Sequence, residues 1–127
     1  MEVVYIADVQ KTYAIVIGAV LVLLGIAGFV PNPLVGNASS AIFGVNVAQN
    51  VLHLVGGALI LWLASKGSAK PTNMWVGIVA LLVGILWFAE SLDGGLLASI
   101  FGINANISYL HIAVGVVSLG VSYGVKE

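Results

Sequence analysis

The chain has 127 residues, of which 61% are hydrophobic and 7% are charged, and it contains no cysteine. Four lysines and five acidic residues give a formal net charge of -1, whereas a soluble domain carries about 25% charged residues to cover its core. This composition excludes a water-soluble globule. It also excludes nucleic-acid binding, which needs a face rich in lysine and arginine. We therefore expect a lipid bilayer around a single membrane domain over residues 1–127.

Four stretches are long and apolar enough to cross a membrane. A transmembrane helix needs about 20 mostly apolar residues, because each adds about 1.5 Å against a hydrocarbon layer of roughly 30 Å. Continuous apolar runs exclude barrel strands, in which apolar and polar residues alternate. The predicted fold is an all-α integral membrane protein with four transmembrane helices at about residues 13–30, 47–64, 74–89 and 105–124.

Prolines and polar residues predict where these helices end. Pro31 and Pro33 follow the first helix, and residues 65–73 form a polar loop in which Thr72 or Asn73 is the expected N-cap of the third helix. The first stretch also resembles a signal peptide. Its apolar run over 14–30 exceeds the usual length of about 7–15 residues, so we expect it to be retained.

The lysines predict the orientation in the membrane. All four lie at one end of the predicted bundle, before the first helix, in the 65–73 loop and after the fourth helix, at Lys11, Lys66, Lys70 and Lys126. Loops rich in lysine and arginine stay in the cytoplasm. We expect a multi-pass protein of the cell membrane with its N- and C-termini in the cytoplasm.

The second half of the chain repeats the first at a spacing of about 58 residues. The segment IFGVN at 42–46 matches IFGIN at 100–104, and a Leu-His pair follows each at the same distance. Glycines that allow close helix packing also match. We predict two tandem helical-hairpin repeats, residues 13–64 and 74–124, related as a parallel repeat by a pseudo-two-fold axis along the membrane normal.

Each returning helix carries a stripe of polar residues. Asn46 and Asn104 are the predicted N-caps, each after a glycine expected in the left-handed conformation. The stripe then continues on one helix face at i+4 and i+7, and each histidine lies about 10 Å below its cap. Polar groups at that depth are expected to face the bundle interior and one another. The stripe residues are Asn46, Asn50 and His53 in the first half and Asn104, Ser108 and His111 in the second.

Three interpretations of the stripes follow. In the preferred one, Asn46, Asn50, Asn104 and Ser108 form a structural polar cluster that hydrogen-bonds both imidazoles. In the second, His53 and His111 hold a haem, another tetrapyrrole or a metal. In the third, the histidines relay protons. Glu90 is expected to be a solvated interfacial acid, outside the repeat. No catalytic constellation is present in the sequence, so we expect no enzyme and predict no cofactor.

The pattern resembles the family of small membrane proteins known as domain of unknown function 4383. The resemblance rests on matching residues in both halves, and Ser108 departs from it because the first half has Asn50 there. It implies a four-helix fold but no activity. We expect a structural or accessory role as a subunit or partner of a larger membrane complex, with other membrane proteins or a second copy. The first-half residues that carry the resemblance are Gly18, Gly25, Phe43-Gly44-Val45-Asn46, Asn50, Leu52-His53 and Gly57.

Overall fold

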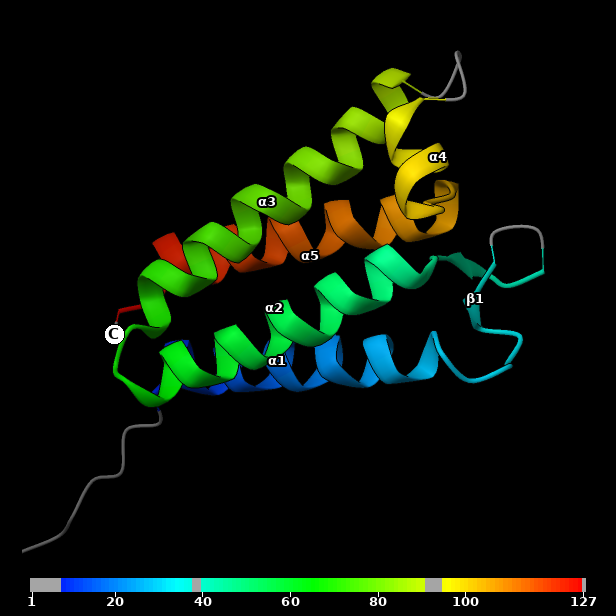
Figure 1. Cartoon of the computed structure of the whole chain (residues 1–127). Helices are drawn as coiled ribbons and strands as arrows, with labels where there is room; N and C mark the ends of the chain where they lie inside the picture. Colours follow the sequence, from blue (N-terminus) through cyan, green and yellow to red (C-terminus); the bar gives the residue numbers. More distant parts are fainter. Residues whose placement is uncertain (1–7, 38–39, 91–94, 127) are drawn as a thin grey trace, which may run out of the picture.

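The structure, a computed structural model, describes residues 8–37, 40–90 and 95–126. Helices dominate the described residues, and two very short strands lie in the first outer connection (Figure 1). In chain order the elements are α1 (Val9–Ala27), β1 (Val35–Gly36), β2 (Phe43–Gly44), α2 (Val47–Ser65), α3 (Ala69–Glu90), α4 (Leu96–Phe101) and α5 (Ala105–Gly124).

Four helices in the described part of the chain, namely α1, α2, α3 and α5, are long and apolar enough to cross a membrane. Large apolar side chains project outward from all four, with Leu23 and Val55 among the most exposed. Such a surface is stable in hydrocarbon, where apolar side chains meet lipid and the helices satisfy their own backbone hydrogen bonds. The chain is therefore an all-α membrane protein, as its composition predicted.

Two predicted helix boundaries are wrong. Helix α1 occupies Val9–Ala27 rather than 13–30. It begins one turn earlier because the Asp8 carboxylate accepts a hydrogen bond from the Lys11 backbone N–H at 3.0 Å. Helix α3 begins at Ala69 rather than 74. Pro71 is tolerated in its first turn, where no backbone donor is needed, so Thr72 and Asn73 lie inside the helix and do not cap it.

The long helices pack as two pairs, α1 with α2 and α3 with α5 (Figure 1). Glycines let the backbones approach in both pairs. A Cβ atom added to Gly57 would lie 2.6 Å from the backbone oxygen of Gly18, and one added to Gly77 would lie 3.0 Å from that of Gly115. Without a hydrophobic drive between helices in lipid, such close backbone contact supplies much of the attraction.

The two outer connections differ, although both end in the matched segments 42–46 and 100–104. In the first, β1 and β2 pair in parallel, with Val35 opposite Phe43. In the second, 96–101 forms α4, which ends at Gly102 with a φ of 66°. The expected left-handed glycine is thus correct at Gly102 but wrong at Gly44, because the described glycines with positive φ are Gly67 and Gly102.

Glu90, at the end of α3, is half-buried and faces α4. Its Oε1 accepts a hydrogen bond from the Leu97 backbone N–H at 3.4 Å. A carboxylate at the first turn of a helix interacts favourably with the unpaired N–H groups there. Glu90 thus links α3 to α4, and its partly exposed side chain does not contradict the expected solvated, interfacial position.

Two apolar clusters mark the ends of the bundle. The inner one joins the start of α1 and α3 to the end of α2, and the outer one packs beneath the outer connections. The caps Asn46 and Asn104 and Ser108 lie at the level of the outer cluster, and His53 and His111 lie further in along α2 and α5. The buried members are Ala14, Ile60, Ala64 and Ala69 in the inner cluster, and Val35, Val45, Ile103 and Ile107 in the outer cluster.

Candidate functional site

The two predicted caps each make two kinds of bond. The Asn46 Oδ1 accepts from the Gln49 backbone N–H at 3.1 Å, and the Asn104 Oδ1 accepts from that of Ile107 at 3.1 Å. The capping prediction is therefore confirmed. In addition, the Asn46 Nδ2 donates to the Ile100 carbonyl at 2.6 Å and the Asn104 Nδ2 donates to the Ile42 carbonyl at 3.1 Å. Each cap thus ties its own helix to the other half of the chain.

Asn50 and Ser108, the next members of the stripes, are buried but directed at backbone. Asn50 packs onto Gly28, where an added Cβ would lie 1.8 Å from its Oδ1. The Ser108 hydroxyl donates to the Asn104 carbonyl one turn before it, at 2.9 Å. The expected hydrogen bonds from these side chains to the imidazoles are wrong, because Ser108 binds the Asn104 carbonyl and Asn50 packs against Gly28 with its Oδ1 unpartnered.

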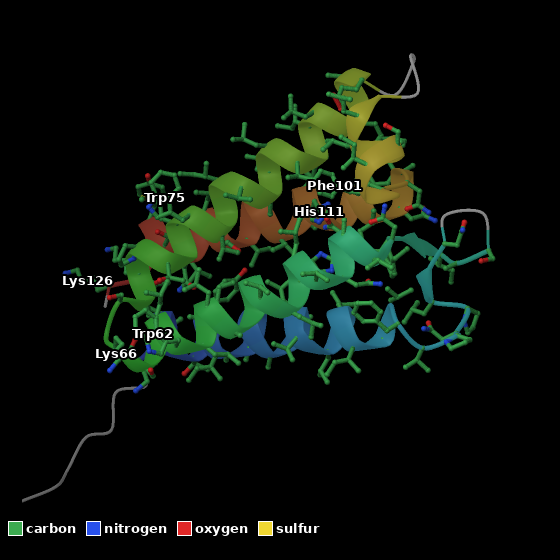
Figure 2. The ribbon with its side chains drawn as sticks, viewed as in Figure 1. Trp62, Lys66, Trp75, Phe101, His111 and Lys126 are labelled. Carbon is green, nitrogen blue, oxygen red and sulfur yellow. The ribbon has the colours of Figure 1, made fainter. Side chains whose placement is uncertain are left out.

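His53 and His111 lie next to one another across the seam between the two helix pairs. Their ring centroids are 6.3 Å apart and the ring planes are inclined by 55°. His53 is only 7% exposed, and His111 is half-buried. Figure 2 shows His111 on α5, on the side of the bundle interior. The structure therefore brings the two histidines together, with one contributed by each half of the chain.

Gln49 is the hydrogen-bonding partner of His53, and the sequence analysis missed it. Its Nε2 lies 2.9 Å from the His53 Nε2, and both side chains are buried. The spacing of i and i+4 on one helix was the available signal. The Nδ1 atoms of His53 and His111 are both buried without a partner. The expectation that each imidazole is hydrogen-bonded within the protein therefore holds for His53, through Gln49, but the Nδ1 atom of each ring is left without a partner.

A second buried polar network, also missed, lies at the inner end of the bundle. The Gln10 Nε2 donates to the carbonyls of Val121 and Val125, both at 2.7 Å. The Asn73 Nδ2 donates to the Gln10 backbone oxygen at 2.9 Å and to its Oε1 at 3.0 Å. These bonds join α1 to α3 and α5. The sequence signal for this network was an amide residue near the start of each of two apolar helices, namely Gln10 and Asn73.

Tyr13 extends this inner network along α1. Its hydroxyl lies 2.5 Å from the Ser118 Oγ on α5, and Ser118 is fully buried. This bond joins the start of α1 to α5. Trp62, Trp75 and Tyr123 are exposed near the same end, as interfacial aromatic residues are.

The described residues hold no group of three or more His, Asp or Glu side chains that could bind a metal. Two surface hollows of about 310 Å³ lie beside residues 28–37 with Ser40 and beside residues 9–16, and no histidine lines either. A tetrapyrrole would need a slot that reaches both imidazoles, so neither hollow suits it. The polar groups of the bundle mainly connect its two halves.

Comparison with known proteins supports the fold. A family model described as Domain of unknown function (DUF4383) matches residues 11–124. No curated protein and no solved structure matches the chain. The matched segment runs from the first turn of α1 to the end of α5 and includes both histidines and both caps. The chain therefore belongs to the DUF4383 family.

Proposed function

We propose that this protein is a non-enzymatic, structural or accessory membrane protein that works as a subunit or partner of a larger membrane complex. The observation that carries this proposal is the use of its buried polar groups. Asn46, Asn104, Gln10 and Asn73 all bind backbone across the seam between the helix pairs. Polar groups committed to backbone in this way stabilise one arrangement of helices and offer little chemistry to a substrate.

The outer surface supports a lateral partner. Beyond the long helices, the described part of the chain consists of short connections. It therefore offers little surface to a water-soluble protein partner. Exposed apolar side chains run along α2 and α5, including Val55 and Val117. Between membrane proteins such surfaces associate by van der Waals packing. The proposed partner is another membrane protein or a second copy of this chain.

We also propose that the chain arose by duplication of one helical hairpin. Equivalent glycines make equivalent contacts in the two pairs. An added Cβ on Gly25 would meet the Asn50 backbone oxygen at 2.8 Å, and one on Gly84 would meet that of Ser108 at 2.9 Å. The residues of the second contact follow those of the first by about 58 residues, which is also the spacing between the matched sequence segments. A parallel repeat of this kind has its two-fold axis along the membrane normal.

The proposed location is the cell membrane, with both termini and the short α2–α3 connection in the cytoplasm. The start of α1 and the end of α5 lie close together, because the Gln10 side chain donates a hydrogen bond to the Val125 carbonyl. Figure 2 shows Lys66 and Lys126 at this same end of the bundle. Lysines gathered at one end favour its retention on the cytoplasmic side.

Extraction of the tagged full chain together with its surrounding native lipid tests the accessory role. A photo-crosslinking residue at Val55 or Val117, both more than half exposed, reports what touches each face. Buried Ile107 is the matched control position. We expect a protein of fixed stoichiometry to crosslink from at least one outer face and not from Ile107. Crosslinking to lipid alone, with the mass of a single chain, would overturn the proposal.

The alternative function is ligand binding or proton transfer at His53 and His111, and the short distance between their rings favours it. An absorption spectrum and metal analysis of the same purified sample separate the two functions. A stoichiometric tetrapyrrole band that vanishes in both His53→Gln and His111→Gln would establish the alternative. A colourless, partner-bound protein would favour the accessory role.

A further inference from the structure

His53 and His111, whose rings are neighbours in the bundle interior, each have one unpartnered buried nitrogen. In the described part of the chain, four buried side-chain atoms have no hydrogen-bond partner, and two of these are the Nδ1 atoms of His53 and His111. The other two are the Oδ1 atoms of Asn50 and Asn73, whereas the two histidine nitrogens belong to neighbouring rings. In a hydrocarbon environment an unpaired polar atom is costly. Two such atoms in neighbouring rings therefore favour a ligand that binds both.

The distance between the rings fits one atom bound between two nitrogens. An imidazole nitrogen lies about 1.1 Å from its ring centroid, and its bonds to metals are about 2.0 Å. A metal held in line between two such nitrogens places the centroids about 6.2 Å apart. The rings are 6.3 Å apart. A direct N–H···N bond of about 2.9 Å would place them near 5.1 Å. Rotation about the nitrogen–metal axis is free, so the 55° between the planes is compatible.

The donor set selects the kind of cation. No third His, Asp or Glu joins the pair among the described residues, and the chain has no cysteine. Zinc needs four ligands in a tetrahedron, and calcium and magnesium need six or more oxygens. Copper(I) forms stable complexes with only two ligands in a linear arrangement. Imidazole is a good copper ligand. A single positive charge is also less costly to bury than a double one.

We propose that His53 and His111 form a two-coordinate site for copper(I), bound between their Nδ1 atoms. Each half of the chain contributes one ligand, so the bound ion would join the helix pairs midway between the outer asparagines and the inner network. This site rests on the alternative function proposed above for the histidine pair, and a failure to bind copper would leave the accessory role untouched.

Gln49 is the positioning residue for this site. Its amide lies 2.9 Å from the His53 Nε2. When a half-turn of the amide presents Oε1 there, the oxygen accepts the Nε2 proton and leaves the lone pair on Nδ1. Histidine ligands of metals usually donate their second N–H to such a partner.

The test uses the purified full chain in lipid nanodiscs under anaerobic conditions. It is titrated with copper(I), with silver(I) as a redox-inert equivalent, and with zinc(II) as control. We expect one equivalent of copper or silver to remain after desalting, and little zinc. The affinity should fall at least tenfold in His53→Gln and His111→Gln, and by about 10–100-fold in Gln49→Leu. Ser118→Ala, which lies in the inner network, should bind as the parent does.

A measurement on the unmodified chain tests the site without relying on variants that could misfold. With ¹⁵N-labelled histidine, silver(I) should shift the Nδ1 resonances of both rings and leave Nε2 largely unchanged. Retention of copper equal to that of a folded His53→Gln/His111→Gln double variant would overturn the proposal, as would silver that leaves both Nδ1 resonances in place. Zinc bound as tightly as copper would also overturn it, because two donors do not suit zinc.

Discussion

Asn46 and Asn104 hold the two halves of the chain by reciprocal bonds. The Asn46 Nδ2 donates to the carbonyl of Ile100, which lies one turn before Asn104 along the chain. The Asn104 Nδ2 donates to the carbonyl of Ile42, which lies at the same distance before Asn46. Each side chain therefore caps its own helix through Oδ1 and binds the opposite half through Nδ2.

Replacing the asparagines by serine separates these two roles. Serine also caps helices, but it is too short to reach the opposite carbonyl. We expect Asn46→Ser to lower the free energy of unfolding by about 1 kcal/mol through the lost cross-bond. Asn46→Ala also removes the cap, so its loss should be about 2 kcal/mol. Denaturant titration in detergent micelles measures both.

A double-mutant cycle tests whether the reciprocal bonds act together. Because they close one seam, Asn46→Ser and Asn104→Ser should be coupled by at least 0.5 kcal/mol or so. Ser118→Ala in the inner network supplies the control, since Ser118 shares no partner with Asn46, and its effect should add to that of Asn46→Ser. Strict additivity of the two serine variants would show that the bonds are independent.

Gly56 and Gly57 are neighbours with opposite surroundings. A Cβ added to Gly57 would lie 2.6 Å from the Gly18 backbone oxygen, whereas one added to Gly56 meets nothing within 4 Å. Gly57→Ala should destabilise the protein by about 1–3 kcal/mol, because α1 and α2 must move apart. Gly56→Ala should be neutral or stabilise by up to about 1 kcal/mol through helix propensity. Equal thermal midpoints for the two variants would contradict this packing.

Gln10→Leu tests the inner network. Leucine keeps most of the volume but leaves the carbonyls of Val121 and Val125 without the Gln10 donor. It also removes the Oε1 that Asn73 binds. We expect a loss of about 1–3 kcal/mol in the free energy of unfolding. The adjacent exposed Lys11 gives the control, since Lys11→Leu should change stability by less than about 0.5 kcal/mol. If both variants unfold alike, the network contributes nothing.

The orientation can be checked in this cysteine-free chain by single cysteines at exposed positions. Ser40 lies in the first outer connection and Ser65 ends α2. A membrane-impermeant thiol reagent applied to intact cells should label Ser40→Cys and should label Ser65→Cys only after permeabilisation. The reverse pattern would place the lysine-rich end outside and refute the proposed topology.

The residue types predicted the parts of the fold that depend on local chemistry. Long apolar runs required membrane-spanning helices, since each helix satisfies its own backbone in lipid. Asn46 and Asn104 each begin a helix as expected, because an asparagine before an apolar run caps it in nearly any surroundings. The ends of α1 and α3 were less predictable. Asp8 and Pro71 extended these helices beyond their apolar cores, into residues that look like loop.

Contacts between distant segments were decided only by the tertiary structure. The matched segments 42–46 and 100–104 differ in conformation, because the first pairs with Val35–Gly36 while the second follows α4. The packing of α2 on α1 places Asn50 against Gly28 and so away from His53. The proximity of His53 to His111 likewise depends on how the helix pairs dock. Helical periodicity assigns a residue to a face, but only the packing of that face determines which atoms it meets.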